Sequence, residues 1–242
     1  MKNADQPLQL TTGNGTAFCL LPPHRGTPRP VLLLFAMAGT DTLTMEPYCR
    51  VGRLLHAHGW NVASLDLPCH GADRRAGEPP ELAGWAARIA NGEDIVAAFQ
   101  TRVNAVVEHL VATGVADPAQ IAAAGTSRGG FMAFHTAAGN PRIRAVAAFA
   151  PVTDLLALTE FAGQAQNPLA KRLALVHAAE TLRDRAAWIT IGNADTRVDT
   201  SKAVAFAHAL TGAVLRVLPT PGHHSFAERH DDAAAWFQKR DN

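Results

Sequence analysis

Ser127 lies in the most informative short motif of the sequence, the pentapeptide Gly-Thr-Ser-Arg-Gly at residues 125–129. The motif follows a short apolar run at residues 121–124 and precedes a segment of helical character at 129–138. A serine on a tight turn between a strand and a helix is held in a strained backbone conformation, and the two flanking glycines remove side chains that would collide there. A Ser/Gly loop that only caps a helix could have the same five residues. The flanking elements favour a nucleophile at position 127.

Two further segments carry the groups that a nucleophilic serine requires. Its hydroxyl needs a general base, and the base needs an orienting carboxylate. Asp195 follows the apolar run 188–191 by four residues. Two imidazoles, His223 and His224, follow the run 213–218. The sequence therefore predicts a Ser, Asp and His set, with each member just past the end of a strand.

The elements that must position these groups can be read from the alternation of short apolar runs with longer segments of helical period. Strands are predicted at residues 31–35, 61–66, 121–124, 143–150, 188–191 and 213–218, with a turn at 116–118. Helices are predicted at 47–58, 94–111, 129–138, 201–210 and 231–239. This alternation implies an α/β fold, with a mostly parallel central sheet and helices on both faces. Residues 152–186 fit no such unit, so a small lid-like insertion is expected there within a single domain spanning 1–242.

Composition excludes several classes of function. Twenty-two Lys and Arg against 21 Asp and Glu leave a formal net charge of +1, which offers no electrostatic basis for binding nucleic acid or an anionic membrane. No apolar run approaches the roughly 18 residues that a membrane span needs. The first ten residues lack the apolar core of a secretory signal. Cys19, Cys49 and Cys69 show no zinc-ligand spacing, which favours buried free thiols and a cytoplasmic location.

The chain resembles the α/β-hydrolase superfamily, in its branch of dienelactone hydrolases and prolyl-oligopeptidase-like serine esterases. The matching stretches are residues 115–130, 192–198, 222–226 and the loop 66–71. The resemblance extends from about residue 16 to residue 240, and it is weakest at 152–186. The order Ser, Asp, His is also the order of the α/β-hydrolase fold. The resemblance implies Ser127 as the nucleophile, Asp195 as the acid and a histidine at 223 or 224 as the base.

The choice between the two histidines depends on the resemblance. The distance along the chain from Leu218 to His223 matches the family's usual spacing, and the Gly-His step also favours His223. The His-Ser-Phe string favours His224 instead, which stays the alternative base. A third histidine, His70, lies in the loop after the second predicted strand and is expected to form a local hydrogen bond.

Acyl transfer also needs two hydrogen-bond donors that face the developing oxyanion. One is expected to be the backbone N–H of Arg128, the residue after the nucleophile. Alignment by strand end gives Met37 as the other donor, although the chain has Phe35 and Ala36 where many hydrolases have His-Gly. Because the donor is a backbone amide, this departure need not abolish it. Met37 could equally fill a gap in the core.

We expect from these residues a serine hydrolase that cleaves small carboxylic esters through an acyl-enzyme, with no cofactor or metal. The expected partner is a small-molecule ester, and the expected oligomeric state is a monomer or homodimer. Alternatives are a dienelactone-, amide- or peptide-cleaving hydrolase with the same triad, and a ligand receptor without turnover. Of these, only the dienelactone hydrolase is weakened by Ser127, because dienelactone hydrolases carry cysteine at the elbow. Arg74, Arg75 and Arg128 could hold a substrate carboxylate, but structural or solvated ion pairs are the simpler expectation.

Overall fold

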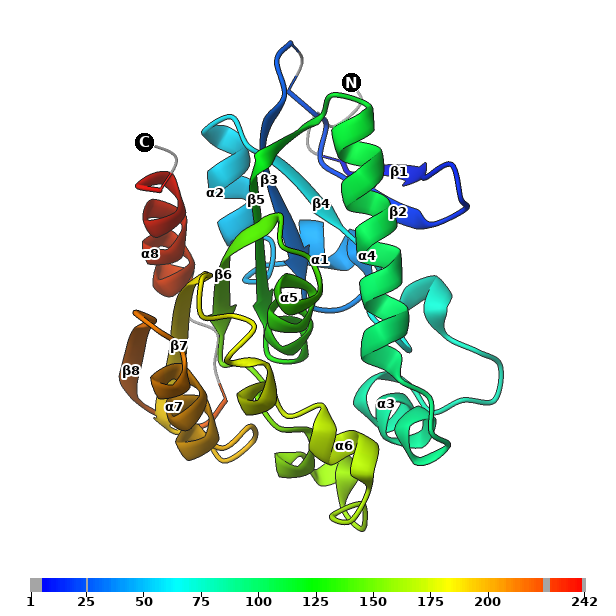
Figure 1. Cartoon of the computed structure of the whole chain (residues 1–242), viewed down its shortest axis with the longest axis vertical. Coiled ribbons are helices and arrows are strands. Elements are labelled where there is room, and N and C mark those ends of the chain that lie inside the picture. Colours follow the sequence, from blue (N-terminus) through cyan, green and yellow to red (C-terminus); the bar gives the residue numbers. More distant parts are fainter. Residues whose placement is uncertain (1–5, 25, 224–226, 241–242) are drawn as a thin grey trace.

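The computed structural model describes residues 6–24, 26–223 and 227–240, which form one eight-stranded sheet with helices on both faces (Figure 1). The strand order is β1-β2-β4-β3-β5-β6-β7-β8. β1 pairs antiparallel with β2, and β2 with β4, whereas every later pair is parallel. The predicted mostly parallel sheet is therefore confirmed. The strands are β1 (Leu8–Thr11), β2 (Ala17–Leu20), β3 (Arg29–Phe35), β4 (Asn61–Ser64), β5 (Ala116–Thr126), β6 (Ile143–Phe149), β7 (Ala186–Ala194) and β8 (Val214–Pro221).

Alternate side chains of the strands point to opposite faces of the sheet and pack into two separate hydrophobic cores, one on each face. In β3, Leu33 and Phe35 join the core under α3, α4, α5 and α7, while Leu32 and Leu34 join the core under α1, α2 and α8. Burial on both faces explains why this strand reads as a continuous apolar run. The helices are α1 (Gly39–Thr44), α2 (Arg50–Ala57), α3 (Glu81–Ala90), α4 (Ile95–Ala112), α5 (Arg128–Gly139), α6 (Pro168–Arg172), α7 (Thr200–Ala209) and α8 (Ala227–Gln238).

Several elements differ from the sequence-based expectation. The antiparallel strands β1 and β2 were not predicted, because each has only four residues and is held by pairing with a neighbour, β1 with β2 and β2 with β4. The helices α1 and α3 were not predicted either. The turn predicted at 116–118 is wrong, since these residues begin β5. The pairing of β5 with β3 is irregular at this point. Ala116 pairs with Arg29, but the next pair is Ile121 with Val31, so residues 117–120 of β5 interrupt the regular ladder.

Residues 152–186, the insertion segment, contain α6 and three short 3-10 helices, η2 (Leu155–Ala157), η3 (Thr159–Phe161) and η4 (Leu175–Ala178). Leu155, Leu158 and Phe161 are buried in the core shared with α3, α4 and α5. These apolar side chains therefore hold the segment against the domain. A movement of this segment as a lid stays a prediction.

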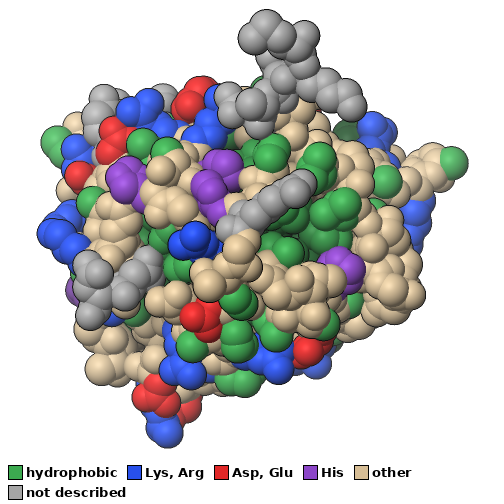
Figure 2. Space-filling model, turned by 90° about the horizontal axis from the view of Figure 1, so that it is seen from above, with side chains coloured by type: hydrophobic (Ala, Val, Ile, Leu, Met, Phe, Trp, Pro, Cys, Tyr) green, Lys and Arg blue, Asp and Glu red, His purple; other side chains and the backbone are tan. Residues whose placement is uncertain are grey.

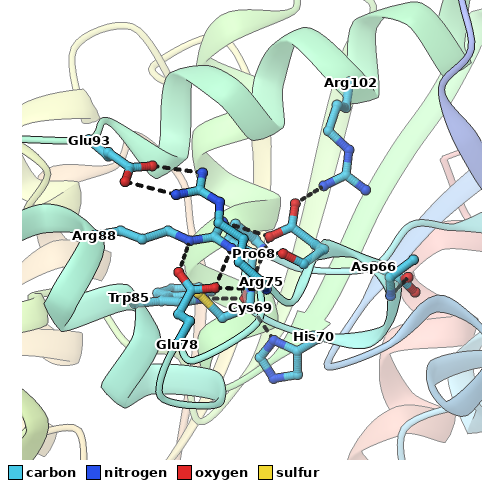
Figure 3. A network of polar contacts seen from close by, with 12 residues as sticks. Asp66, Pro68, Cys69, His70, Arg75, Glu78, Trp85, Arg88, Glu93 and Arg102 are labelled. Carbon is cyan, nitrogen blue, oxygen red and sulfur yellow. Dashed lines mark hydrogen bonds and ion pairs between the residues drawn. The ribbon is translucent and has the colours of Figure 1, made fainter.

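The loop after β4 is fixed to α3 and α4 by a network of charged side chains (Figure 3). The Arg88 side chain is 6% exposed and contacts Asp73 Oδ2 at 2.6 Å, and it also pairs with Glu78. Arg102 of α4 contacts the other oxygen of Asp73 at 2.9 Å. The backbone N–H of Cys69 also donates to Asp73. Because every charge in the network has an opposite partner, the loop is held where it meets the sheet edge.

We expect Arg88→Met to lower the free energy of unfolding by about 3–5 kcal/mol, because it leaves the charges of Asp73 and Glu78 without their shared partner. Hydrogen bonding to Arg88 lowers the pKa of Glu78 from 4.5 to about 2. This stabilisation is complete above pH 4.5 and is lost as the pH falls towards 2. Urea unfolding at pH 7 and pH 3 should therefore show a smaller difference between wild type and variant at pH 3.

Arg183→Met is the matched control, because Arg183 forms an exposed ion pair with Glu180. It should change the free energy of unfolding by less than about 1 kcal/mol. Equal losses in the two variants, or a difference that stays constant with pH, would contradict the assigned role of the network.

Figure 2 views the end of the molecule where the parallel strands begin, opposite the loops that follow their carboxyl ends. Basic and acidic side chains are interspersed on this face (Figure 2). None of the helices in the described ranges is long and apolar enough to cross a membrane.

Candidate active site

Ser127 lies on the turn that joins β5 to α5, with φ 54° and ψ −117°. A positive φ is unfavourable for a residue with a side chain, so neighbouring contacts must hold the turn. The N–H of Ser127 donates to the carbonyl of Phe149 at 2.8 Å, and its carbonyl accepts the N–H of Val152 at 3.1 Å. Both partners belong to or follow the adjacent strand β6. The sheet itself therefore holds the serine in its strained conformation.

The two glycines of the motif are required because the backbone passes close to itself and to β3. A Cβ on Gly125 would lie 2.2 Å from the carbonyl carbon of Gly129. A Cβ on Gly129 would lie 1.9 Å from the carbonyl oxygen of Phe35. These approaches bring the first turn of α5 into backbone contact with the end of β3. The segment that contains Met37 is thereby placed beside the serine.

Gly129→Val is expected to prevent formation of the native turn, because a side chain cannot occupy a site 1.9 Å from a backbone oxygen. Expression should give little folded monomer by circular dichroism and size-exclusion chromatography. Gly13→Val is the control, since a Cβ on Gly13 has no neighbouring atom within 4 Å. A Gly129→Val protein with the thermal stability of the wild type would show that this turn is an ordinary loop.

Asp195 directly follows β7, and its carboxylate is buried and fully hydrogen-bonded. Its Oδ1 accepts the backbone N–H groups of Arg197 at 2.9 Å and Val198 at 3.2 Å. Its Oδ2 lies 2.8 Å from Nδ1 of His223. Thr200, which no sequence signal singled out, binds the backbone N–H of Asp195 through its hydroxyl at 3.0 Å. One carboxylate oxygen is thus fixed by the loop and the other faces the histidine.

His223 connects the carboxylate to the serine. Nδ1 lies 2.8 Å from Asp195 Oδ2, and Nε2 lies 3.0 Å from Ser127 Oγ. Because a carboxylate can only accept here, Nδ1 carries a proton; in the neutral imidazole Nε2 then has the lone pair that can accept from the serine hydroxyl. The structure thus brings together Ser127, Asp195 and His223, as the sequence analysis expected, although their catalytic roles stay predictions. The alternative base His224 lies outside the described residues.

The two backbone N–H groups predicted to bind the oxyanion differ in their hydrogen bonding. The backbone N–H of Arg128 lies in the first turn of α5, where helix N–H groups have no partner within the helix. The backbone N–H of Met37 donates to the hydroxyl of Thr42 at 3.1 Å. No sequence pattern singles out Thr42, which is fully buried in α1. The Met37 donor is therefore engaged in this structure, and its part in an oxyanion hole stays a prediction.

His70 makes the expected local hydrogen bond, from Nδ1 to the carbonyl of Pro68 at 2.8 Å. Its Nε2 is buried and has no hydrogen-bond partner among the residues that the structure describes. Burial, and then the nearby positive charge of Arg128, lower the pKa of His70. The ring is consequently neutral at pH 7, with Nε2 as an unused acceptor.

Two of the three arginines considered as carboxylate clamps form ion pairs. Arg75 binds Glu93 at 2.8 Å, and Arg128 binds Glu81 at 2.7 Å. Arg74 is exposed. The simpler expectation of ion pairs therefore holds for Arg75 and Arg128.

The three cysteines are free and buried, as expected. Burial raises their pKa values, and that of Cys69 reaches about 12, so the thiols are protonated at pH 7. In the described part of the chain, no group of three or more His, Cys, Asp or Glu side chains could hold a metal ion.

Comparison with known families gives one match, in which the model of the prolyl oligopeptidase family covers residues 100–241. No curated protein gives a significant match. Many solved structures share the fold. Acetyl xylan esterase 1 from Thermoanaerobacterium sp. JW/SL YS485 has a TM-score of 0.70 at 16% identity, over 96% of this chain and 82% of that one.

Two further solved structures illustrate the range of proteins that share the fold. An S-formylglutathione hydrolase from Agrobacterium tumefaciens has a TM-score of 0.69 at 18% identity, over 97% of this chain and 94% of that one. A Mycobacterium tuberculosis puromycin-hydrolyzing peptidase has a TM-score of 0.74 at 15% identity; the match covers 97% of this chain but only 40% of the peptidase.

Proposed function

Because the chain belongs to the prolyl oligopeptidase family of α/β-hydrolases, and is therefore a hydrolase, we propose that it cleaves small carboxylic esters through Ser127, His223 and Asp195. The observation that carries the proposal is the continuous chain of hydrogen bonds from Asp195 through His223 to Ser127 Oγ. Both distances are hydrogen-bond distances, and the one between His223 Nε2 and Ser127 Oγ is short enough for proton transfer. The three groups have the relation that nucleophilic catalysis by serine requires.

In the acylation step, Ser127 Oγ attacks the ester carbonyl carbon while its proton passes to His223 Nε2. The carbonyl oxygen becomes an oxyanion, which the backbone N–H groups of Arg128 and Met37 would stabilise. Asp195 stabilises the imidazolium through Nδ1–H. As the tetrahedral intermediate collapses, the proton moves from Nε2 to the leaving alkoxide, and an alcohol departs from the acyl-serine.

Deacylation repeats these steps with water as the nucleophile. His223 Nε2 removes a proton from water, and the resulting hydroxide adds to the acyl carbon. When this second intermediate collapses, the proton returns to Ser127 Oγ and the carboxylic acid is released. The proposed cycle uses only side chains and backbone amides of this chain together with water.

A small ester is favoured as substrate by two observations. The apolar side chains Leu155, Leu158 and Phe161 of the insertion segment face the core, and a single exposed valine, Val176, is too small a surface for a lipid aggregate. Two of the compared structures, which match more than four-fifths of their own length, are named as an acetyl xylan esterase and an S-formylglutathione hydrolase. The family match itself favours a second candidate, cleavage of an amide or peptide bond by the same triad.

The test combines a substrate series with an active-site label. Initial rates would be measured on p-nitrophenyl esters from acetate to octanoate and on p-nitroanilides with the same acyl groups. A fluorophosphonate probe, followed by peptide mass spectrometry, would locate the modified residue. Fast turnover of the short esters with an adduct on Ser127 supports the esterase, whereas faster turnover of the anilides favours the amidase. Saturable binding without turnover or labelling would instead support a receptor on this scaffold.

A further inference from the structure

Arg128 has a side chain that turns back towards the loop after β3. Its Nε donates to the carbonyl oxygen of Ala36 at 3.0 Å, and its Nη1 binds Glu81 of α3 at 2.7 Å. The Arg128 side chain is 18% exposed, compared with 56% for Glu81. The guanidinium group is therefore fixed between two segments, and its contact with Ala36 is the less exposed of the two.

The Ala36 carbonyl belongs to the same peptide group as the Met37 N–H. A trans peptide is planar, and its C=O and N–H point in opposite directions, so fixing one fixes the other. The carbonyl accepts from Arg128, while the N–H donates to Thr42 Oγ1 at 3.1 Å. This peptide lies beside the serine turn, because a Cβ on Gly129 would lie 2.9 Å from the Ala36 Cα.

We propose that Arg128 is a positioning residue for the oxyanion hole, in which its guanidinium group pins the Ala36 carbonyl and so sets the direction of the Met37 N–H. The inference rests on the proposed function, since it needs an oxyanion that forms at Ser127. It gives the side chain of Arg128 a task separate from that of its own backbone N–H.

The physical reason is that this peptide has two orientations with opposite electrostatic effects. If it flipped, the Ala36 oxygen would replace the Met37 N–H, and its partial negative charge would repel the oxyanion. A flip must break the hydrogen bond from the positively charged guanidinium, which is stronger than one between neutral groups. With the carbonyl held by Arg128, the N–H can leave Thr42 by tilting, without a reversal of the peptide.

The ion pair with Glu81 supplies an independent way to test this assignment. Exposed ion pairs contribute little to stability, and removing the Glu81 charge leaves the Nε to Ala36 hydrogen bond possible. The effect of Glu81→Gln should therefore be smaller than that of losing the guanidinium. A substrate clamp would behave differently, because it would depend on the net charge at this position.

The experiment compares kcat and KM of Arg128→Met, Arg128→Lys and Glu81→Gln on p-nitrophenyl butyrate, with Arg75→Met as the control. Methionine keeps an unbranched apolar side chain and the backbone N–H of residue 128, so only the guanidinium contacts are lost. Loss of a complete oxyanion donor costs about 10²–10³-fold, so we expect Arg128→Met to lower kcat by about 10–100-fold. KM should change by less than about three-fold, because the oxyanion is absent from the ground state.

Arg128→Lys should recover part of kcat, because an ammonium group can still donate to Ala36. Glu81→Gln should lose less than Arg128→Met. Arg75→Met should match the wild type, since the Arg75 side chain is exposed and its ion pair is with Glu93, which contacts neither the triad nor Ala36 in the described residues. Thermal unfolding would establish that each variant is folded. If Arg128→Met does not fold, Arg128→Ala is measured in its place, because it also keeps the backbone N–H of residue 128 and lacks the guanidinium group; a kcat equal to that of wild type would contradict the assignment.

Three results would overturn the inference. The first is an unchanged kcat in Arg128→Met, and the second is an equal loss in Glu81→Gln. The third is a defect confined to KM for an ester that carries a free carboxylate, such as p-nitrophenyl hemisuccinate, which would make Arg128 a substrate clamp. Wild-type turnover and labelling of Ser127 are measured first. Their absence refutes the proposed function, whereas their presence with any of these three results refutes only the positioning role.

Discussion

Ser127→Ala should abolish ester hydrolysis, with kcat lowered by about 10⁶-fold, because no other group can form the acyl-enzyme. The side chain makes its one described hydrogen bond with His223, so its removal should leave the turn and the domain folded. Hydrolysis of p-nitrophenyl butyrate, labelling by the fluorophosphonate probe and the melting temperature would be measured on the same preparation. The expected result is loss of turnover and of labelling at an unchanged melting temperature.

A conservative control for this variant is Ser201→Ala. Ser201 lies at the start of α7 and is exposed, with its hydroxyl bonded to Asp199. This variant should keep wild-type turnover and labelling. Residual activity of more than about 1% in Ser127→Ala would show that the nucleophile is another residue.

His223→Ala should lower kcat by at least about 10⁴-fold, because it removes the group that accepts the serine proton and returns it to the leaving group. The structure brings this imidazole to 3.0 Å from Ser127 Oγ and 2.8 Å from Asp195 Oδ2. The adjacent substitution His224→Ala should change kcat by less than about ten-fold. Steady-state rates of both variants on one short ester provide the comparison.

Each of the two histidine variants is the control for the other, since both remove one imidazole from the same segment. A severe loss in the 224 variant with mild loss in the 223 variant would reverse the assignment. Equal severe losses at unchanged melting temperature would mean that both imidazoles take part in turnover. Either result would require a different route for the serine proton.

The parallel part of the fold could be predicted because each element has a local signature. Residues 31–35 of β3 are all apolar because both faces of the strand are buried there, and α4 keeps one apolar face along its length. The strands β1 and β2 lack such a signature because each has four residues and depends on pairing with neighbours. The helix α3 carries Gly84 in its middle, where a Cβ would lie 2.6 Å from Cys69 Sγ. That glycine weakens the helical pattern, and its reason is a tertiary contact.

In the candidate site, too, the residues with a local sequence pattern were predictable, and those that act through tertiary contacts were not. The turn at Ser127 was predictable because the two glycines that its close backbone contacts require lie within two residues of the serine. Asp195 and His223 were predictable as loop residues at strand ends, where parallel strands bring loops to one edge. Thr42 and Thr200 were not, because a hydroxyl that supports a backbone N–H has no pattern of its own. The acceptor of the Arg128 side chain, 92 residues away along the chain, was equally hidden.

The sequence by itself determined the alternation of the parallel strands with the longer helices, the serine turn with its glycines and the loops that carry the acid and the two histidines. These features depend on residues within a few positions of one another, so local chemistry is sufficient. Only the tertiary structure decided which imidazole lies 3.0 Å from Ser127, which hydroxyl the Met37 N–H contacts, and that Arg128 reaches Ala36. Those outcomes depend on how separate loops meet at the sheet edge, where a shift of about 1 Å makes or breaks a hydrogen bond.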